Sequence, residues 1–125
     1  MTAGLAPTHA NALLNVLRNT AAAAIAAPTV QLHTADPGAT GVTAASVGDA
    51  TKRAVTWNAA SAGSMTLLSL AAYTNGGTSE TITHISVWDG ATFVRSAALT
   101  ASQAWVSTNT LTFSTLTFSL TPIAA

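Results

Sequence analysis

The chain contains no cysteine, and this absence excludes several kinds of site. Disulfide frameworks, zinc knuckles and thiol nucleophiles all depend on cysteine. Charged residues are scarce as well: they make up 6% of the 125 residues, whereas soluble domains carry about 25%. The formal net charge is zero, and the only adjacent basic pair is Lys52-Arg53. The chain therefore lacks the positive surface that nucleic-acid binding requires.

Long hydrophobic runs are also missing. The longest, Ala21–Ala27, is far shorter than the roughly 20 residues that cross a bilayer, so we expect no association with a membrane. Hydrophobic residues nevertheless make up 49% of the chain, which argues against disorder. A surface with so little charge resists association poorly. The length fits one globular domain, and we expect neighbouring subunits to cover its surface.

The N-terminal part has the periodicity of one short helix. Over residues 8–19, apolar side chains recur at helical spacing and form a narrow stripe: Ala10, Leu13, Leu14 and Leu17. Thr8 is the expected N-cap, with Pro7 just outside the helix. Our favoured interpretation is that the stripe packs on the chain's own core, and the alternative is that it packs on a neighbouring subunit. Residues 1–28 are thus assigned to this helix and an Ala/Pro connector.

Residues 29–125 alternate with a period of two, which indicates a β-rich domain. We expect half-buried strands over 29–34 and 52–58, an exposed loop over 39–50, and a further strand over 65–73. The strand over 81–89 is expected to be central and covered on both faces. Of its residues, Ile85 and Val87 share one face, and Ile82, His84 and Trp88 share the other. The Asp89-Gly90 turn indicates a hairpin.

The last segment alternates with one change of phase near Ser114-Thr115, which predicts a bulge or a short turn. It carries no charge from Gln103 onward, so it is expected either to be central in the sheet or to pair with another copy. Pro122 is expected to stop the final strand. Together the segments predict a mostly β fold: an antiparallel β-sandwich or barrel-like domain of about seven or eight short strands after one short N-terminal α-helix.

Candidate catalytic residues are few. His33 and Asp36 have a spacing that permits two metal ligands, but a zinc site needs three or four. We therefore expect Asp36 to cap a turn and His33 to face solvent. His84, Ser86 and Asp89 resemble a triad only in composition, because a triad draws its members from separate segments. We expect no catalytic residue, no cofactor and no metal, and hence no enzyme.

Six stretches occur in an order that resembles a known family: "NALLNVL", "VQLHTADPGATG", "KRAVTWNAASAGS", "THISVWDGAT", "SAALTAS" and "LTFSTLTFSL". They resemble small virion proteins of tailed bacteriophages, notably those that infect actinobacteria. Such proteins are of the tail-fibre, minor tail or minor capsid kind. The resemblance covers nearly the whole chain and implies a structural role in the virion. It carries no catalytic residues to this sequence.

Three functions follow from these observations. The favoured one is a capsid-decorating, minor capsid subunit that stabilises the shell, as a homotrimer in contact with the major capsid protein. The alternative is a tail-fibre or minor tail protein, with Trp105 and the 39–50 loop as candidates for contact. A remote alternative is a small glycan-binding module that uses Trp57, Trp88 and Trp105. The candidate interface residues are Leu13, Leu14, Leu17, Trp105, Leu111, Phe113, Leu116 and Phe118.

Overall fold

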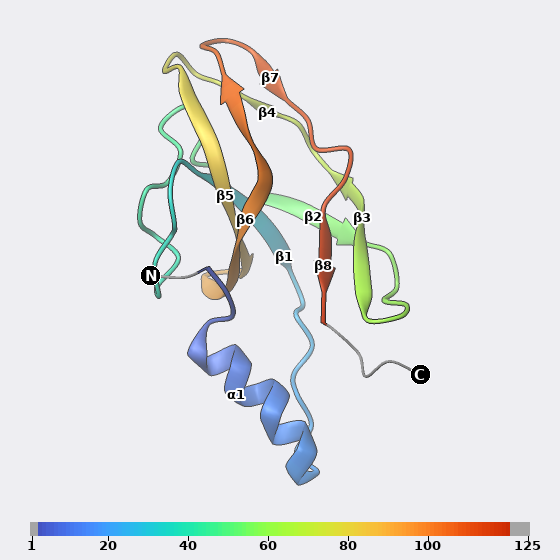
Figure 1. Ribbon diagram of the computed structural model, residues 1–125. Coiled ribbons are helices and arrows are strands. Elements are labelled where there is room, and N and C mark those ends of the chain that lie inside the picture. The colour runs from blue at the N-terminus through green and yellow to red at the C-terminus, as the bar shows by residue number, and fades with distance from the viewer. Residues whose placement is uncertain (1–2, 121–125) are drawn as a thin grey trace.

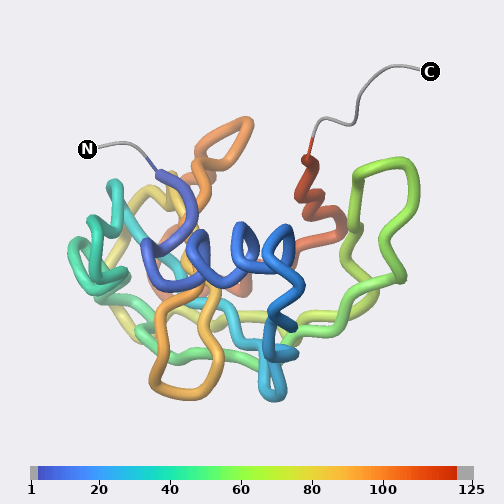
Figure 2. Tube along the Cα trace, turned by 90° about the horizontal axis from the view of Figure 1, so that it is seen from below, coloured from blue at the N-terminus to red at the C-terminus, as the bar shows by residue number. Residues whose placement is uncertain are grey.

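A computed structural model describes residues 3–120, and its main feature is a six-stranded antiparallel sheet curled into a trough (Figure 1). The strand order across the trough is β6-β5-β1-β2-β3-β8, and a small second sheet pairs β4 with β7. Figure 2 shows the curled sheet from below, with α1 lying across its open end. The elements are α1 (Pro7–Asn15), the 3-10 turn η1 (Val16–Arg18), β1 (Pro28–His33), β2 (Arg53–Trp57), β3 (Ser64–Leu70), β4 (Tyr73–Thr74), β5 (Glu80–Asp89), β6 (Thr92–Trp105), β7 (Thr110–Leu111) and β8 (Thr117–Ser119). The prediction of a mostly β fold, with about eight strands after one helix, is confirmed.

The helix begins one residue earlier than predicted. Ala6 is the N-cap and Pro7 is the first helical residue, so the assignment of Thr8 as the N-cap was wrong. Proline suits the first helical position, because its φ is already helical and no hydrogen bond is lost there. The chain leaves the helix at Asn19, which adopts a left-handed conformation with φ of 61°. No residue of α1 is buried, so the favoured packing of its stripe on the chain's own core was also wrong.

β1 is buried on both faces, although its alternation predicted a strand with one solvent face. Val30 and Leu32 point into the core, and Gln31 and His33 are buried on the other face. The covering segment on that other face is residues 34–50. The backbone N–H of Ser46 donates to the Leu32 carbonyl (2.9 Å), and the Gln31 amide donates to the Ala50 carbonyl (3.0 Å). The expectation of an exposed 39–50 loop therefore holds only for part of it, because its polar backbone groups bond to the sheet.

β5 lies between β6 and β1, as predicted for a central strand. The Asp89-Gly90 hairpin is confirmed, with Asp89 paired to Thr92. The assignment of faces needs one correction, because Ile82 and Ile85 both belong to the core. The register against β6 shifts between Ile82 and His84, and this irregularity breaks the alternation on which the face assignment depended.

The C-terminal segment divides between the two sheets. β7 pairs with β4 and β8 pairs with β3, and the chain between them contains the predicted change of phase. β8 ends the strand order, so it lies at an edge of the large sheet and not in its centre. The prediction for Pro122 lies outside the described residues. Side chains from both sheets meet in one core: Val30, Leu32, Val55, Tyr73, Ile82, Ile85, Val87, Val94, Trp105 and Leu116.

Gly41 ties the covering segment to the sheet and provides a test of this packing. Its φ is +76°, and a Cβ atom there would lie 2.7 Å from Cγ of Phe93. We expect Gly41→Ala to lower the free energy of unfolding by about 2 kcal/mol or more, from backbone strain and steric conflict together. Chemical denaturation would measure the change.

Gly90→Ala is the matched control. Gly90 also has positive φ (+57°), but nothing lies within 4 Å of its Cβ position. Its cost should be about 1 kcal/mol, from backbone strain alone. Equal costs for the two variants would contradict the close packing of the covering segment on Phe93.

Candidate functional site

The helix stripe predicted as an interface is uncovered. The exposed fractions are 40% for Leu13, 63% for Leu14 and 86% for Leu17. Val16 adds a further exposed apolar side chain, at 51%. Contiguous exposed apolar residues of this kind mark sites of interaction with another macromolecule.

The other predicted interface residues either belong to the chain's own core or pack against it. Trp105 is 2% exposed, and its indole N–H donates to the Asn109 carbonyl (2.9 Å). Leu116 is buried with it, so both side chains offer little surface to a partner. The remaining three are partly buried and pack against the core: Leu111, Phe113 and Phe118.

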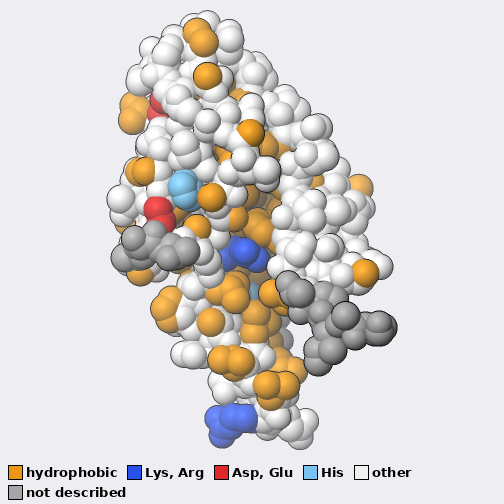
Figure 3. All heavy atoms as spheres, in the orientation of Figure 1, with side chains coloured by type: hydrophobic (Ala, Val, Ile, Leu, Met, Phe, Trp, Pro, Cys, Tyr) orange, Lys and Arg blue, Asp and Glu red, His pale blue; other side chains and the backbone are white. Residues whose placement is uncertain are grey.

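An apolar groove of about 510 Å³ lies between α1 and the trough. Figure 3 shows hydrophobic side chains gathered over α1 and in the hollow above it, with a basic side chain at the centre. The groove brings together segments that are distant in the sequence: the N-terminal segment, the connector, the β2–β3 hairpin and strands β6 and β8. Its lining includes Leu5, Leu13, Ile25, Trp57, Val94 and Phe118. The spacing of α1 predicted Leu13 as an interface residue, but no sequence signal predicted the groove.

A β-bulge turns the guanidinium of Arg95 toward this groove. The register between β5 and β6 shifts between Val87 and Trp88, which leaves Val94 as an extra residue in β6. Successive side chains Val94 and Arg95 both line the groove as a result. The Arg95 guanidinium lies over the Phe118 ring at 4.1 Å, which links the two edge strands of the sheet. Burial lowers the pKa of Arg95 below its usual value, because the charged form loses water.

His33 is fully buried, so the prediction that it faces solvent was wrong. Its Nδ1 lies 2.9 Å from the Thr43 carbonyl oxygen, and its Nε2 lies 2.7 Å from Ser86 Oγ. A carbonyl only accepts, so Nδ1 carries the proton and the Ser86 hydroxyl donates to Nε2. The Trp88 indole donates in turn to Ser86 Oγ (2.7 Å). The result is a buried, uncharged chain of hydrogen bonds that holds the covering segment on β1 and β5.

This arrangement differs from a catalytic site. Ser86 has no exposed surface, so no substrate reaches its hydroxyl. The three residues that resembled a triad only in composition make separate contacts: His84 Nδ1 bonds to Thr83 Oγ1, and the Asp89 carboxylate accepts from the Ala27 backbone N–H. Asp36 caps its turn as predicted, because it accepts from the Gly38 N–H (2.9 Å).

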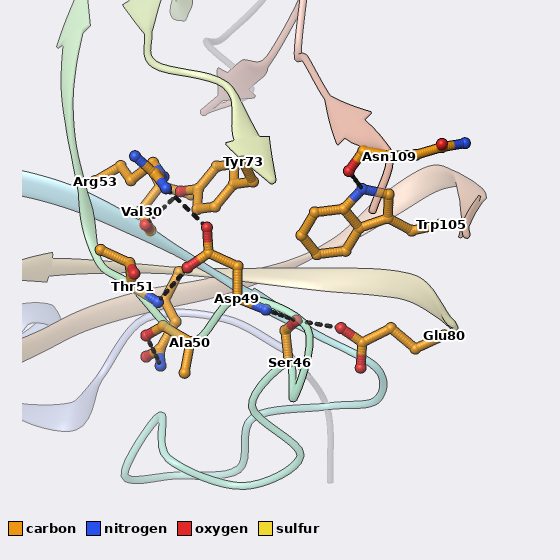
Figure 4. Close-up of polar contacts among 11 residues, drawn as sticks. Val30, Ser46, Asp49, Ala50, Thr51, Arg53, Tyr73, Glu80, Trp105 and Asn109 are labelled. Atoms are coloured by element: carbon orange, nitrogen blue, oxygen red, sulfur yellow. Dashed lines mark hydrogen bonds and ion pairs between the residues drawn. The ribbon is translucent and has the colours of Figure 1, made fainter. Parts of the chain in front are cut away.

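The other acidic side chains also hold loops in place. Figure 4 shows Asp49 bonded to Arg53 and Thr51, and Glu80 bonded to Ser46. Burial alone would raise the pKa of Asp49. The hydrogen bonds from Arg53 and Thr51 and the positive charge of Arg53 instead bring that pKa below its usual value. Within residues 3–120, no three His, Asp or Glu side chains are grouped so that they could hold a metal ion. No helix in the same range is long and apolar enough to span a membrane.

The three tryptophans do not form a stacking surface for a glycan. Trp88 and Trp105 are buried, and Trp57 is half-buried against the edge of Phe118 with ring centroids 5.3 Å apart. Lys52 covers the Trp88 ring at 3.3 Å. The tryptophans are therefore anchors of the fold, and the candidate site is the apolar groove with the helix face beside it.

Comparison with protein families identifies the chain. A family described as Podophage GP4 fiber I protein gp80 matches residues 4–121. The chain belongs to this fibre family. Membership supports a bacteriophage structural role and a virion location, and it fits the tail-fibre alternative better than the capsid decoration that we favoured from the sequence. No curated protein sequence matches the chain.

The buried His33 provides a test by pH. Burial, the largest cause, and the nearby His84 lower the pKa of His33 below its ordinary value of 6.5. Below pH 6.5 the unfolded chain therefore binds more protons than the folded chain. The free energy of unfolding should fall as the pH drops from 7 toward 5, measured by denaturant titration at several pH values.

The variant His33→Leu separates this effect from other titrations. It should be less stable at pH 7 by about 2 kcal/mol, because Thr43 and Ser86 lose a buried partner. Its stability should also change less between pH 7 and pH 5 than that of the parent protein. Gln31→Leu, which removes a buried amide that does not titrate, is the control and should keep the parental pH dependence. An unchanged pH dependence in His33→Leu would contradict the role assigned to this histidine.

Proposed function

We propose that the chain is a non-enzymatic tail-fibre subunit of a tailed-phage virion that associates with copies of itself, as a homotrimer, and with tail proteins. The match to a fibre family over residues 4–121 is the observation that carries this proposal. The uncovered helix face supports it, since a lone subunit would leave Leu14 and Leu17 in water.

The edges of the large sheet give a second line of support. The N-terminal segment covers β6 near its start. There the Ser96 N–H donates to the Gly4 carbonyl (2.8 Å), and Leu5 forms an isolated antiparallel β-bridge with Arg95. On the same edge, the part of β6 that follows Ser96 has no strand partner among residues 3–120, and neither has the outer side of β8. Residues 96–120 contain neither a charge nor a proline, which are two of the devices that protect an edge. Both edges are therefore suited to pairing with neighbouring copies.

Capsid decoration and a fibre role differ most in stoichiometry. A fibre component should be present at a small number of copies per virion. Quantitative mass spectrometry of purified particles against the major capsid protein would measure the ratio. A ratio of the same order as the major capsid protein would contradict the fibre role and favour decoration of the shell.

The helix face can be tested by paired substitutions. Leu14→Gln with Leu17→Gln should lower the oligomeric mass measured by light scattering, while the unfolding temperature of the separated subunit stays within a few degrees of the parent's, because both side chains are exposed. Leu68→Gln on β3 is the matched control, since Leu68 is 64% exposed and Leu14 is 63% exposed. Equal effects of the helix pair and Leu68→Gln would count against the helix face as an interface.

A further inference from the structure

We propose that the groove around Arg95 is a docking site for an apolar peptide segment that carries a carboxylate, supplied by a neighbouring virion protein and not by a second copy of this chain. This inference rests on the proposed structural role and adds the chemistry of the partner.

The first argument is an uncompensated charge. The Arg95 side chain is half-buried, and its Nε is buried with no hydrogen-bond partner among residues 3–120. The ion pair found in that range joins Arg53 to Asp49, at 2.8 Å, and leaves Arg95 out. None of the residues that line the groove is Asp or Glu. A half-desolvated cation without a counter-charge is costly, and its contact with the Phe118 ring offsets only part of that cost.

The second argument concerns what would satisfy Arg95. A planar guanidinium pairs best with a carboxylate, which can accept two parallel hydrogen bonds. The rest of the lining is mostly apolar, including Leu5, Leu13, Ile25 and Trp57. An occupant that fits both features has an apolar body and one acidic group.

The third argument disfavours a second copy as the source of the carboxylate. The exposed helix α1 contains no Asp or Glu. Each of the four acidic side chains of the chain already accepts a local hydrogen bond: Asp36 from Gly38, Asp49 from Arg53, Glu80 from Gly48 and Asp89 from Ala27. Asp49 and Glu80 use both carboxylate oxygens in contacts of this kind, and Asp36 and Asp89 each use one oxygen to hold a turn or the connector in place. A second copy therefore offers no carboxylate that is free of a structural role.

The fourth argument favours a peptide over a small molecule. Leu5 and Leu13 line the groove beside α1 and are 36% and 40% exposed. Leu120, at the other end of the groove, is 67% exposed. An occupant longer than the groove would cover these side chains as well, and the gain grows with the apolar area removed from water.

The experiment compares two amphipathic helical peptides that differ at one central position, Glu in one and Gln in the other, both otherwise built of Leu, Ala and Ser. Binding to the full chain is measured by fluorescence anisotropy. The Glu peptide should bind about tenfold more tightly than the Gln peptide, as a charge-assisted contact to Arg95 implies. Arg95→Met should abolish the difference between the two peptides, and Arg18→Met on η1, which does not line the groove, should preserve it.

Three outcomes would overturn the proposal. The first is equal binding of the two peptides to the parent chain, and the second is a preference for Glu that survives Arg95→Met in a protein with a native circular dichroism spectrum. The third is a loss of oligomeric mass in Arg95→Met without peptide, which would assign the groove to a second copy. Because these measurements use the isolated chain, they can fail while the copy number in particles still supports a fibre role, and the reverse also holds.

Discussion

The antiparallel pairing of β1 with β5 places two strands at the centre of the sheet with both faces covered. Val30 pairs with Val87 and Leu32 pairs with Ile85, and these four side chains form the floor of the core. On the opposite face, His33 and Ser86 join residues 34–50 to the sheet through uncharged hydrogen bonds. This double layer also positions the groove, because β6 pairs with β5 and supplies Val94 and Arg95 to the groove lining.

The two irregularities in the β5–β6 ladder have different consequences. The one near Ile82 brings an additional isoleucine into the core. The one at Val94 turns an arginine toward an apolar groove. A regular ladder would have placed Val94 and Arg95 on opposite faces, so a single extra residue changes a surface cation into a lining residue. The most distinctive feature of the surface therefore comes from a departure from regular sheet geometry.

The sequence predicted the fold class, the central position of the strand over 81–89, its hairpin and the break in the terminal segment. These features follow from local alternation and turn residues, which a single sequence displays directly. The burial of His33 and Gln31 could not be predicted in this way, because it depends on residues 34–50 folding back over the sheet. The groove could not be predicted either, since its lining runs from Leu5 to Leu120 and its segments share no motif. The tail-fibre alternative came second in our sequence interpretation, because the compact, single-domain length favoured a capsid subunit over a fibre that reaches the host.

The short N-terminal cover of β6 has a consequence for the order of folding. Gly4 and Ser96, which it joins, are separated by 92 residues, so this contact is among the most distant along the chain. Contacts with long sequence separation have the largest loop-closure cost and tend to be made late. During synthesis, β5 and β6 can form their hairpin as soon as both emerge, while the start of the chain has yet to return to them. During this interval a neighbouring chain and the chain's own first residues compete for the same backbone groups at the edge of β6. The local concentration of subunits therefore influences which of the two pairs with that edge.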